Sequence, residues 1–278
     1  ERRERGLKGM VSLGSQRDLA ILKASLDALS QDDRPVSENL DRLFDISLAR
    51  RLAAITVTLL PQLGDRVVAG PFAGMTYPPD TAEGCFVPKL LGCYEQELHP
   101  ALAQFILGRP DAVLNIGCAE GYYAVGLARA LPEAKVYAWD IAPDAREKTA
   151  RNAAANGVGD RITVAADFDP VMLGDYTDGI SLIICDIEGA EFEDLDPGRY
   201  PALSAFDMIV EAHPDENRTV EELAGRFSST HRVGIVYPQP RNPAAHDLLN
   251  GLTPLDQSLA LFERLESTPW IICHAARD

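Results

Sequence analysis

Two short acidic segments, each directly after an apolar run, carry the side chains best suited to chemistry. Residues 180–185 lead into Asp186-Ile187-Glu188-Gly189-Ala190-Glu191, and residues 206–210 lead into Glu211-Ala212-His213. An imidazole takes up a proton near neutral pH, and a carboxylate does so when burial raises its pKa. His213, Asp186 and Glu188 are therefore the candidate catalytic residues, and any of the three is a candidate general base.

The same two segments also offer ligands for a divalent cation. Asp186, Glu211 and His213 follow neighbouring strands of the expected sheet, and two carboxylates plus an imidazole can bind such an ion. A bound cation would acidify a hydroxyl group. The alternative, which the pattern favours, is that Glu211 and His213 only form hydrogen bonds with loop backbone.

A glycine-bearing turn links a buried strand to a helix near the middle of the chain. The apolar run 113–116 is followed by Gly117-Cys118-Ala119-Glu120-Gly121, a helical pattern, and a second run, 136–139, that ends on Asp140. Strand, turn, helix and strand with an acid at the tip predict the first half of a nucleoside-binding sheet. Gly117 permits the sharp turn, and Asp140 is placed to accept hydrogen bonds from ribose hydroxyls.

The residues of this turn indicate which nucleoside it holds. A dinucleotide site requires G-x-G-x-x-G, but Ala119 and Tyr122 stand at the second and third glycine positions. The Glu120 carboxylate would repel a pyrophosphate, whereas S-adenosylmethionine has no phosphate and carries a sulfonium and an ammonium group. The turn therefore favours S-adenosylmethionine, which Gly121 would allow the backbone to approach closely. Asp167, at the tip of the third strand, is placed to accept from the adenine amino group.

Three stretches together resemble the FkbM-like family of class I methyltransferases, over roughly residues 70–237. They are the G-x-x-x-G-Y-Y turn, the D-I-E-G-A-E sequence and the upstream L-L-G-C-Y-E-Q-E-L. The resemblance implies a class I fold, S-adenosylmethionine as methyl donor and hydroxyl methylation of small molecules or sugars. It further implies that residues 117–122 and Asp140 hold the cofactor and that Asp186, Glu188 and Glu191 line the reaction site. This chain departs from the usual pattern at Asn115, where such enzymes carry an acid. The full set of candidate cofactor-binding residues is Tyr94, Asn115, Gly117, Cys118, Ala119, Glu120, Gly121, Tyr122, Asp140, Ile141, Asp167, Phe168 and Asp186.

Apolar runs alternating with helical patterns predict a seven-stranded, doubly wound, Rossmann-like α/β methyltransferase sheet. The expected strands are 113–116, 136–139, 161–165, 180–185, 206–210, 233–237 and 270–274. We expect an N-terminal helical extension over residues 1–65 and a methyltransferase domain over 66–278, with 238–268 inserted between the last two strands. Residues 66–79 predict a strand with Gly/Pro turns.

Helical patterns outside the sheet leave two alternatives open. Those over 16–30 and 37–60 predict helices that cover a core or, less favoured, pair two subunits in a homodimer. Glu95, Glu97 and His99 are interpreted as a solvated helix start, with a lid over the cofactor as the alternative.

Composition excludes several classes of partner. The net charge is −16 without a long basic run, which argues against binding a nucleic-acid backbone. The longest apolar stretch, residues 52–61, is too short to cross a bilayer, and the scattered cysteines indicate reduced thiols in a cytoplasmic protein. We therefore expect a cytoplasmic enzyme that methylates a small molecule, favouring a hydroxyl oxygen. The alternatives are a small-molecule N-methyltransferase, an NAD-linked oxidoreductase and a non-catalytic nucleoside-binding protein.

Overall fold

The computed structural model describes residues 23–24, 35–79, 85–265 and 267–277. The helix predicted over 16–30 lies outside these residues, apart from positions 23 and 24. The main helices are α3 (Val36–Leu63), α4 (Phe86–Leu91), α5 (His99–Gly108), α6 (Tyr122–Ala130), α7 (Pro143–Ala155), α8 (Glu191–Asp194), α9 (Val220–Phe227) and α10 (Pro254–Ala260). The strands are β1 (Ala112–Ile116), β2 (Lys135–Trp139), β3 (Ile162–Ala165), β4 (Ser181–Cys185), β5 (Phe206–Glu211), β6 (His231–Val236) and β7 (Trp270–Ala275).

The predicted seven-stranded sheet is confirmed, with the strand order β3-β2-β1-β4-β5-β7-β6. The first five strands are parallel, whereas β7 runs antiparallel to both β5 and β6. The chain order reverses between β1 and β4, the switch point outside which open α/β sheets bind ligands. The carboxyl ends of β1, β2, β4 and β5 therefore share one edge.

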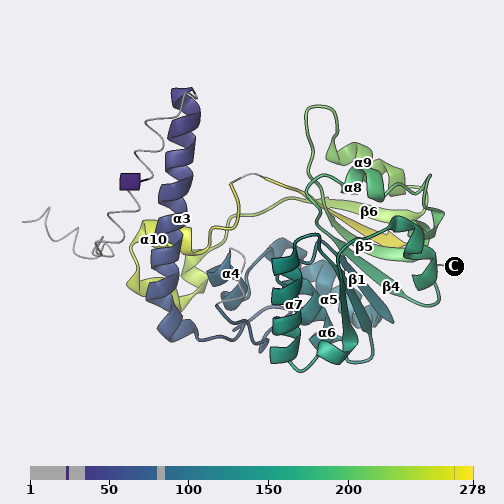
Figure 1. The fold of residues 1–278 in the computed structure, drawn as a ribbon, viewed down its shortest axis with the longest axis horizontal. Helices are drawn as coiled ribbons and strands as arrows, with labels where there is room; N and C mark the ends of the chain where they lie inside the picture. The colour runs from purple at the N-terminus through teal and green to yellow at the C-terminus, as the bar shows by residue number, and fades with distance from the viewer. Residues whose placement is uncertain (1–22, 25–34, 80–84, 266, 278) are drawn as a thin grey trace, which may run out of the picture. The chain divides into compact units, whose positions relative to one another are not determined.

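Helices cover both faces of the sheet (Figure 1). On one face, Leu114 and Ile183 pack with Phe192 of α8 and Leu223 of α9 in a buried cluster. The strands alternate, so Val113 and its neighbours face α5, α6 and α7. Burial on both faces explains why the central strands read as continuous apolar runs rather than alternating ones.

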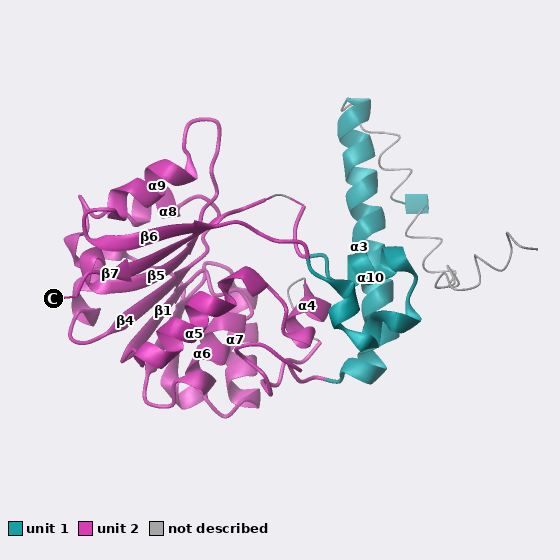
Figure 2. Cartoon of the chain, turned by 180° about the vertical axis from the view of Figure 1, so that it is seen from behind, with its two compact units in different colours: residues 1–64, 241–262 teal, residues 65–240, 263–278 magenta. Residues whose placement is uncertain are grey.

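The chain divides into two compact units, shown in Figure 2. One comprises residues 1–64 and 241–262, and the other, which contains the sheet, comprises residues 65–240 and 263–278. Within the first unit, α3 packs on α10. A two-pronged ion pair joins these helices, with Arg51 Nε 2.7 Å from Asp256 Oδ1 and Arg51 Nη2 2.5 Å from Asp256 Oδ2.

One predicted strand is absent. Residues 66–79 form turns with a single bridge between Arg66 and Thr76, because glycines and prolines interrupt any longer ladder. Tyr77 from this segment is nevertheless 1% exposed and belongs to the core.

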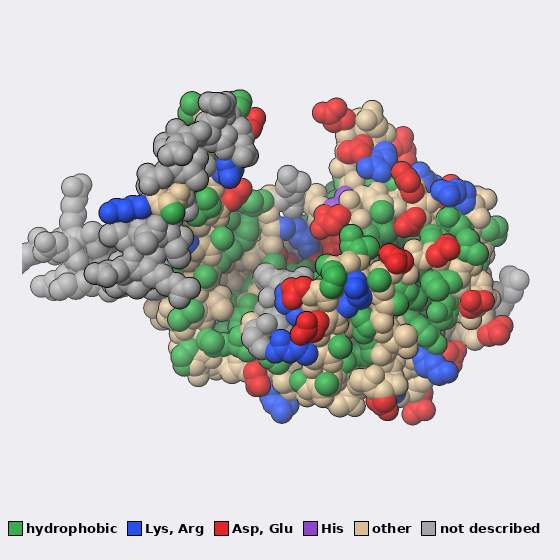
Figure 3. Space-filling model, viewed as in Figure 1, with side chains coloured by type: hydrophobic (Ala, Val, Ile, Leu, Met, Phe, Trp, Pro, Cys, Tyr) green, Lys and Arg blue, Asp and Glu red, His purple; other side chains and the backbone are tan. Residues whose placement is uncertain are grey.

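The visible surface carries side chains of both charges. Asp and Glu side chains are spread over the visible surface of the described residues, with Lys and Arg interspersed rather than gathered in one patch (Figure 3). No helix in the described part of the chain combines the length and apolar character needed to cross a bilayer.

Gly117 fixes the contact between the ends of β1 and β4. Its φ is +76°, and a Cβ there would lie 1.7 Å from the carbonyl oxygen of Asp186. The Asp186 N–H in turn donates to the carbonyl of Ile116 at 2.9 Å. A side chain at position 117 would therefore force the two strand ends apart.

We expect Gly117→Ala to lower the free energy of unfolding by at least about 2 kcal/mol, because backbone clash adds to an unfavourable positive φ. Urea denaturation measures this loss. Gly157→Ala is the matched control, since Gly157 has a φ of +67° but no atom within 4 Å of its would-be Cβ. The control should lose only about 1 kcal/mol. Equal losses in the two variants would contradict a role for close packing at Gly117.

Candidate active site

Contacts with Asp140 and with α7 fix the conformation of the turn after β1. Asp140 Oδ2 accepts from the Ala119 N–H at 2.9 Å, and Asp140 Oδ1 accepts from the Ala142 N–H at 2.8 Å. Each carboxylate oxygen keeps a further lone pair for a ligand. At the far end of the turn, a Cβ on Gly121 would lie 2.9 Å from the Thr149 side chain. Gly121 is therefore required for packing against α7, and the approach of its backbone to a ligand stays a prediction.

Glu120 is buried and paired inside the protein. Its side chain is 1% exposed and accepts from the Lys89 ammonium and the Tyr77 hydroxyl. The Lys89 ammonium also lies 4.8 Å from the centre of the Tyr94 ring. The prediction that Glu120 faces a cationic ligand is wrong, because a buried carboxylate requires a partner and Lys89 supplies it. Lys89 gave no signal in the sequence, since it lies 31 residues from its partner.

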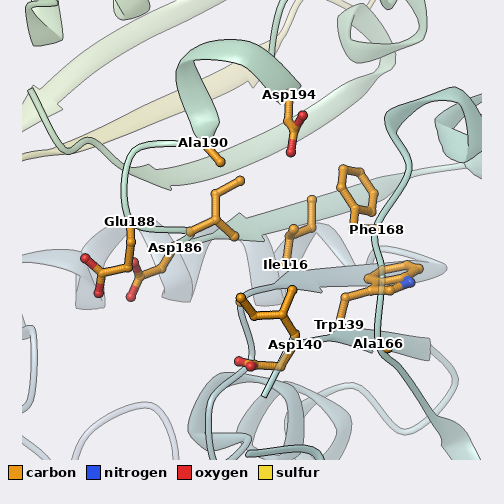
Figure 4. A pocket seen from close by; sticks show the side chains of 12 residues that line it. Ile116, Trp139, Asp140, Ala166, Phe168, Asp186, Glu188, Ala190 and Asp194 are labelled. Carbon is orange, nitrogen blue, oxygen red and sulfur yellow. The ribbon is translucent and has the colours of Figure 1, made fainter. Parts of the chain in front are cut away.

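A cavity of about 290 Å³ opens at the carboxyl edge of the sheet between the ends of β1, β2 and β4 (Figure 4). Its walls include Ile116, Trp139, Phe168 and Ile187, and its polar side chains are all carboxylates. The residues that line it are Ile116, Gly117, Trp139, Asp140, Ile141, Ala166, Phe168, Asp186, Ile187, Glu188, Ala190 and Asp194. This lining contains four acids and no lysine or arginine, so it fits a cationic nucleoside and offers no partner to a pyrophosphate.

Five of the predicted cofactor-binding residues line this cavity: Gly117, Asp140, Ile141, Phe168 and Asp186. The other eight do not line it: Tyr94, Asn115, Cys118, Ala119, Glu120, Gly121, Tyr122 and Asp167. Tyr122 and Tyr94 pack edge to face with ring centres 5.5 Å apart, and Cys118 lies 3.5 Å from the Thr149 hydroxyl. Asn115 is 2% exposed and donates to the carbonyl of Ile184 at 3.4 Å. Asp167 is exposed.

His213 lies beside the cavity acids and is held by Glu191. Glu191 is fully buried, and its Oε1 accepts from the His213 backbone N–H at 2.7 Å and lies 3.3 Å from Nδ1 of the same residue. The opposite ring nitrogen, Nε2, lies 3.7 Å from Asp186 and 3.6 Å from Glu188. The structure thus brings together all three candidate catalytic residues. A carboxylate on Nδ1 favours the tautomer that leaves Nε2 free to accept a proton.

The charges around His213 shift the pKa values of the cluster. Burial raises the pKa of Asp186 to about 8, with the neighbouring Glu211 acting in the same direction. Burial alone would lower the pKa of His213, but the Glu191 hydrogen bond and the carboxylates of Asp186 and Glu211 raise it to about 9. Burial raises the pKa of Glu191 as well, and the hydrogen bonds from His213 more than reverse this effect.

Arg264 links two further acids next to this cluster. Its guanidinium pairs with Glu95 and with Glu211, and Thr268 also donates to Glu211. Glu95 is 1% exposed and accepts from the Tyr123 hydroxyl. The interpretation of Glu95 as part of a solvated helix start is therefore wrong. Arg264 was missed because it follows the irregular segment before β7, where no pattern marks it.

The predicted cation ligands also come together. One ligand atom from each of Asp186, Glu211 and His213 lies within 4.8 Å of the others. Among the described residues, Asp186 Oδ1 is buried without a hydrogen-bond partner. The Glu211 Oε1 atom, by contrast, already accepts from Arg264 and Thr268.

Comparisons with known proteins bear on the enzyme class. Residues 113–194, which include β1, the turn, Asp140 and the first acidic segment, match the family model described as a methyltransferase domain. No curated protein matches the chain in sequence.

Several solved structures are similar. An O-methyltransferase from Klebsiella pneumoniae is 12% identical, with 83% of this chain and 90% of that one covered, at a TM-score of 0.42. The O-methyltransferase TomG from Streptomyces achromogenes, solved with SAM, is 16% identical, with 72% and 83% covered, at 0.43. A precorrin-6y C5,15-methyltransferase from Geobacter metallireducens is 14% identical, with 63% and 88% covered, at 0.42. Likeness at this level does not determine an activity, so the enzyme class rests on the family match. That match confirms the predicted class: the chain carries an S-adenosylmethionine-dependent methyltransferase domain.

Proposed function

We propose that this enzyme methylates a hydroxyl oxygen of a small-molecule acceptor, with His213 as the general base and Glu191 as the residue that orients it. S-adenosylmethionine supplies the methyl group as a sulfonium. The position of His213 is the observation that most directly supports this proposal. Its Nδ1 lies 3.3 Å from the buried Glu191, and its Nε2 lies beside Asp186 and Glu188 at the cavity.

The need for a general base distinguishes methylation of a hydroxyl from methylation of an amine. A hydroxyl must lose its proton as its oxygen attacks, whereas a neutral amine already presents a lone pair. The Glu191–His213 pair provides a proton acceptor at the strand edge where an acceptor molecule would lie. The resemblance to the FkbM-like family, which implies hydroxyl methylation, also supports this proposal.

The cavity residues support the same placement of the cofactor. Asp140 retains lone pairs for ribose hydroxyls, and the apolar walls suit a purine ring. Asp186 and Glu188 are placed to face the sulfonium and ammonium groups, and they adjoin His213. His213 would then stand near the methyl group, as in-line transfer requires.

We expect His213→Ala to lower kcat by about 10²- to 10⁴-fold, the usual contribution of a general base. The measurement is S-adenosylhomocysteine release with phenols, monosaccharides and hydroxy acids as trial acceptors. Affinity for S-adenosylhomocysteine, measured by calorimetry, should change little because His213 does not line the cavity. An unchanged kcat, or turnover of amines alone, would contradict hydroxyl methylation.

The raised pKa of His213 predicts an alkaline pH profile. With a pKa of about 9, His213 is protonated at pH 7 and becomes a base only as pH rises. The kcat/KM value, which reports the titration of the free enzyme, should therefore increase up to tenfold per pH unit below this pKa and level off above it. Glu191→Gln removes the anion that raises the pKa, so the midpoint should move to lower pH while kcat falls about tenfold or more through loss of the correct tautomer.

Glu193→Gln is the matched control for this experiment, because Glu193 is an exposed glutamate two residues along the same short helix. Its pH profile should coincide with that of the wild type. A Glu191→Gln profile with an unshifted midpoint would show that Glu191 does not control the titration of the base.

A second arrangement would use Asp186, Glu211 and His213 as ligands of a divalent cation, and the buried Asp186 Oδ1, which accepts no hydrogen bond from the described residues, favours it. Glu211 weighs against it, since Arg264 already neutralises that carboxylate. We therefore expect activity to survive exhaustive chelation with EDTA. Loss of activity in EDTA and its recovery with Mn²⁺ or Mg²⁺ would contradict the general-base proposal and would indicate a metal centre instead.

A further inference from the structure

One carboxylate of the cavity has no role in the account above. Asp194 is the last residue of α8 and is partly buried. Figure 4 shows its side chain directed into the cavity beside Phe168, on the side away from Glu188. Within the described part of the chain, no group donates a hydrogen bond to this carboxylate.

The end of the cavity near Asp194 combines aromatic surface with a single carboxylate. Phe168 and Trp139 offer aromatic surface, with ring centres 5.3 Å apart, and Ile116 is also apolar. An ionised carboxylate only accepts hydrogen bonds, so a flat ring placed here gains from an N–H donor on its edge. Burial and the adjacent Glu193 raise the pKa of Asp194, and the charge of Arg199 only partly offsets them.

The polar groups of the cavity define an order along the ligand. Asp186 and Glu188 are placed for the cationic end and Asp140 for the ribose, so the base is left for the remaining end, between Phe168 and Asp194. We propose that Asp194 accepts a hydrogen bond from the exocyclic amino group of adenine and thereby selects adenine over purines with an oxygen at that position. This inference rests on S-adenosylmethionine as the cofactor and deepens it by naming a specificity-determining residue.

The proposal differs from the prediction based on sequence. Asp167 follows β3 and is placed by pattern to accept from the adenine amino group, but it is exposed and does not line the cavity. Asp194 comes from a different loop, after β4, and lines the cavity directly. The two carboxylates thus provide a test with an internal control.

The experiment measures the affinities of S-adenosylhomocysteine and S-inosylhomocysteine by calorimetry for the wild type, Asp194→Asn, Asp194→Ala and Asp167→Asn. Inosine replaces the amino donor with an oxygen acceptor, which a carboxylate repels and an amide can satisfy. We expect the wild type to prefer the adenosyl compound by at least about tenfold, because a mismatched buried acceptor is costly. Asp194→Asn should weaken adenosyl binding about tenfold and strengthen inosyl binding, whereas Asp194→Ala should only weaken adenosyl binding.

Asp167→Asn should reproduce the wild-type preference. Preference lost in Asp167→Asn and retained in both Asp194 variants would overturn the inference in favour of the exposed residue. Unchanged preference in every variant would overturn it as well. Failure of the wild type to bind S-adenosylhomocysteine would instead remove the cofactor assignment, and this inference with it. Thermal unfolding midpoints close to that of the wild type establish that each variant is folded.

Discussion

The contact between the ends of β1 and β4 is the constraint on which the site depends. Gly117 leaves no room for a side chain because the Asp186 carbonyl occupies the space where a Cβ would lie. This contact, with the hydrogen bond from Asp186 to Ile116, sets the first acidic segment directly beside the turn that precedes α6. The cavity, the acids that line it and the Glu191–His213 pair all depend on that contact. A wider spacing here would separate the cavity from His213.

The second constraint is that buried acidic side chains are paired with basic ones. Glu120 is neutralised by Lys89, and Glu95 and Glu211 share Arg264. A buried carboxylate without such a partner would be strongly destabilising, so these pairings are conditions for folding rather than sources of large net stability. Four further acids, by contrast, line the cavity, and the lining contains no lysine or arginine. The charge of this lining suits the cationic cofactor of the proposed reaction.

The sequence predicts the sheet and its reacting edge well, but it does not predict which side chains face the ligand. Strand tips could be placed because apolar runs and parallel strands determine which residues share an edge, and so Asp140, Asp186 and His213 were found. Glu120 was misassigned because its fate depends on Lys89, which a local pattern does not reveal. Asp194 was overlooked because a four-residue helix has too little periodicity to indicate which of its residues points inward. The antiparallel β7 between β5 and β6 likewise depends on tertiary pairing rather than on local sequence.

The acids around His213 stabilise the protonated imidazole, and this opposes the proposed use of His213 as a base. S-adenosylmethionine bound as proposed would change this balance, because its sulfonium would bring a further positive charge toward the same acids. Like charges compete, so a bound cation lowers the pKa of His213 toward the range in which the imidazole accepts a proton. In the proposed reaction the product of the cofactor would be a neutral thioether, and His213 would hold the proton of the acceptor. The positive charge that faces the acidic edge would therefore be the same before and after the reaction, and the edge would not need to reorganise as charge moves from sulfur to imidazole.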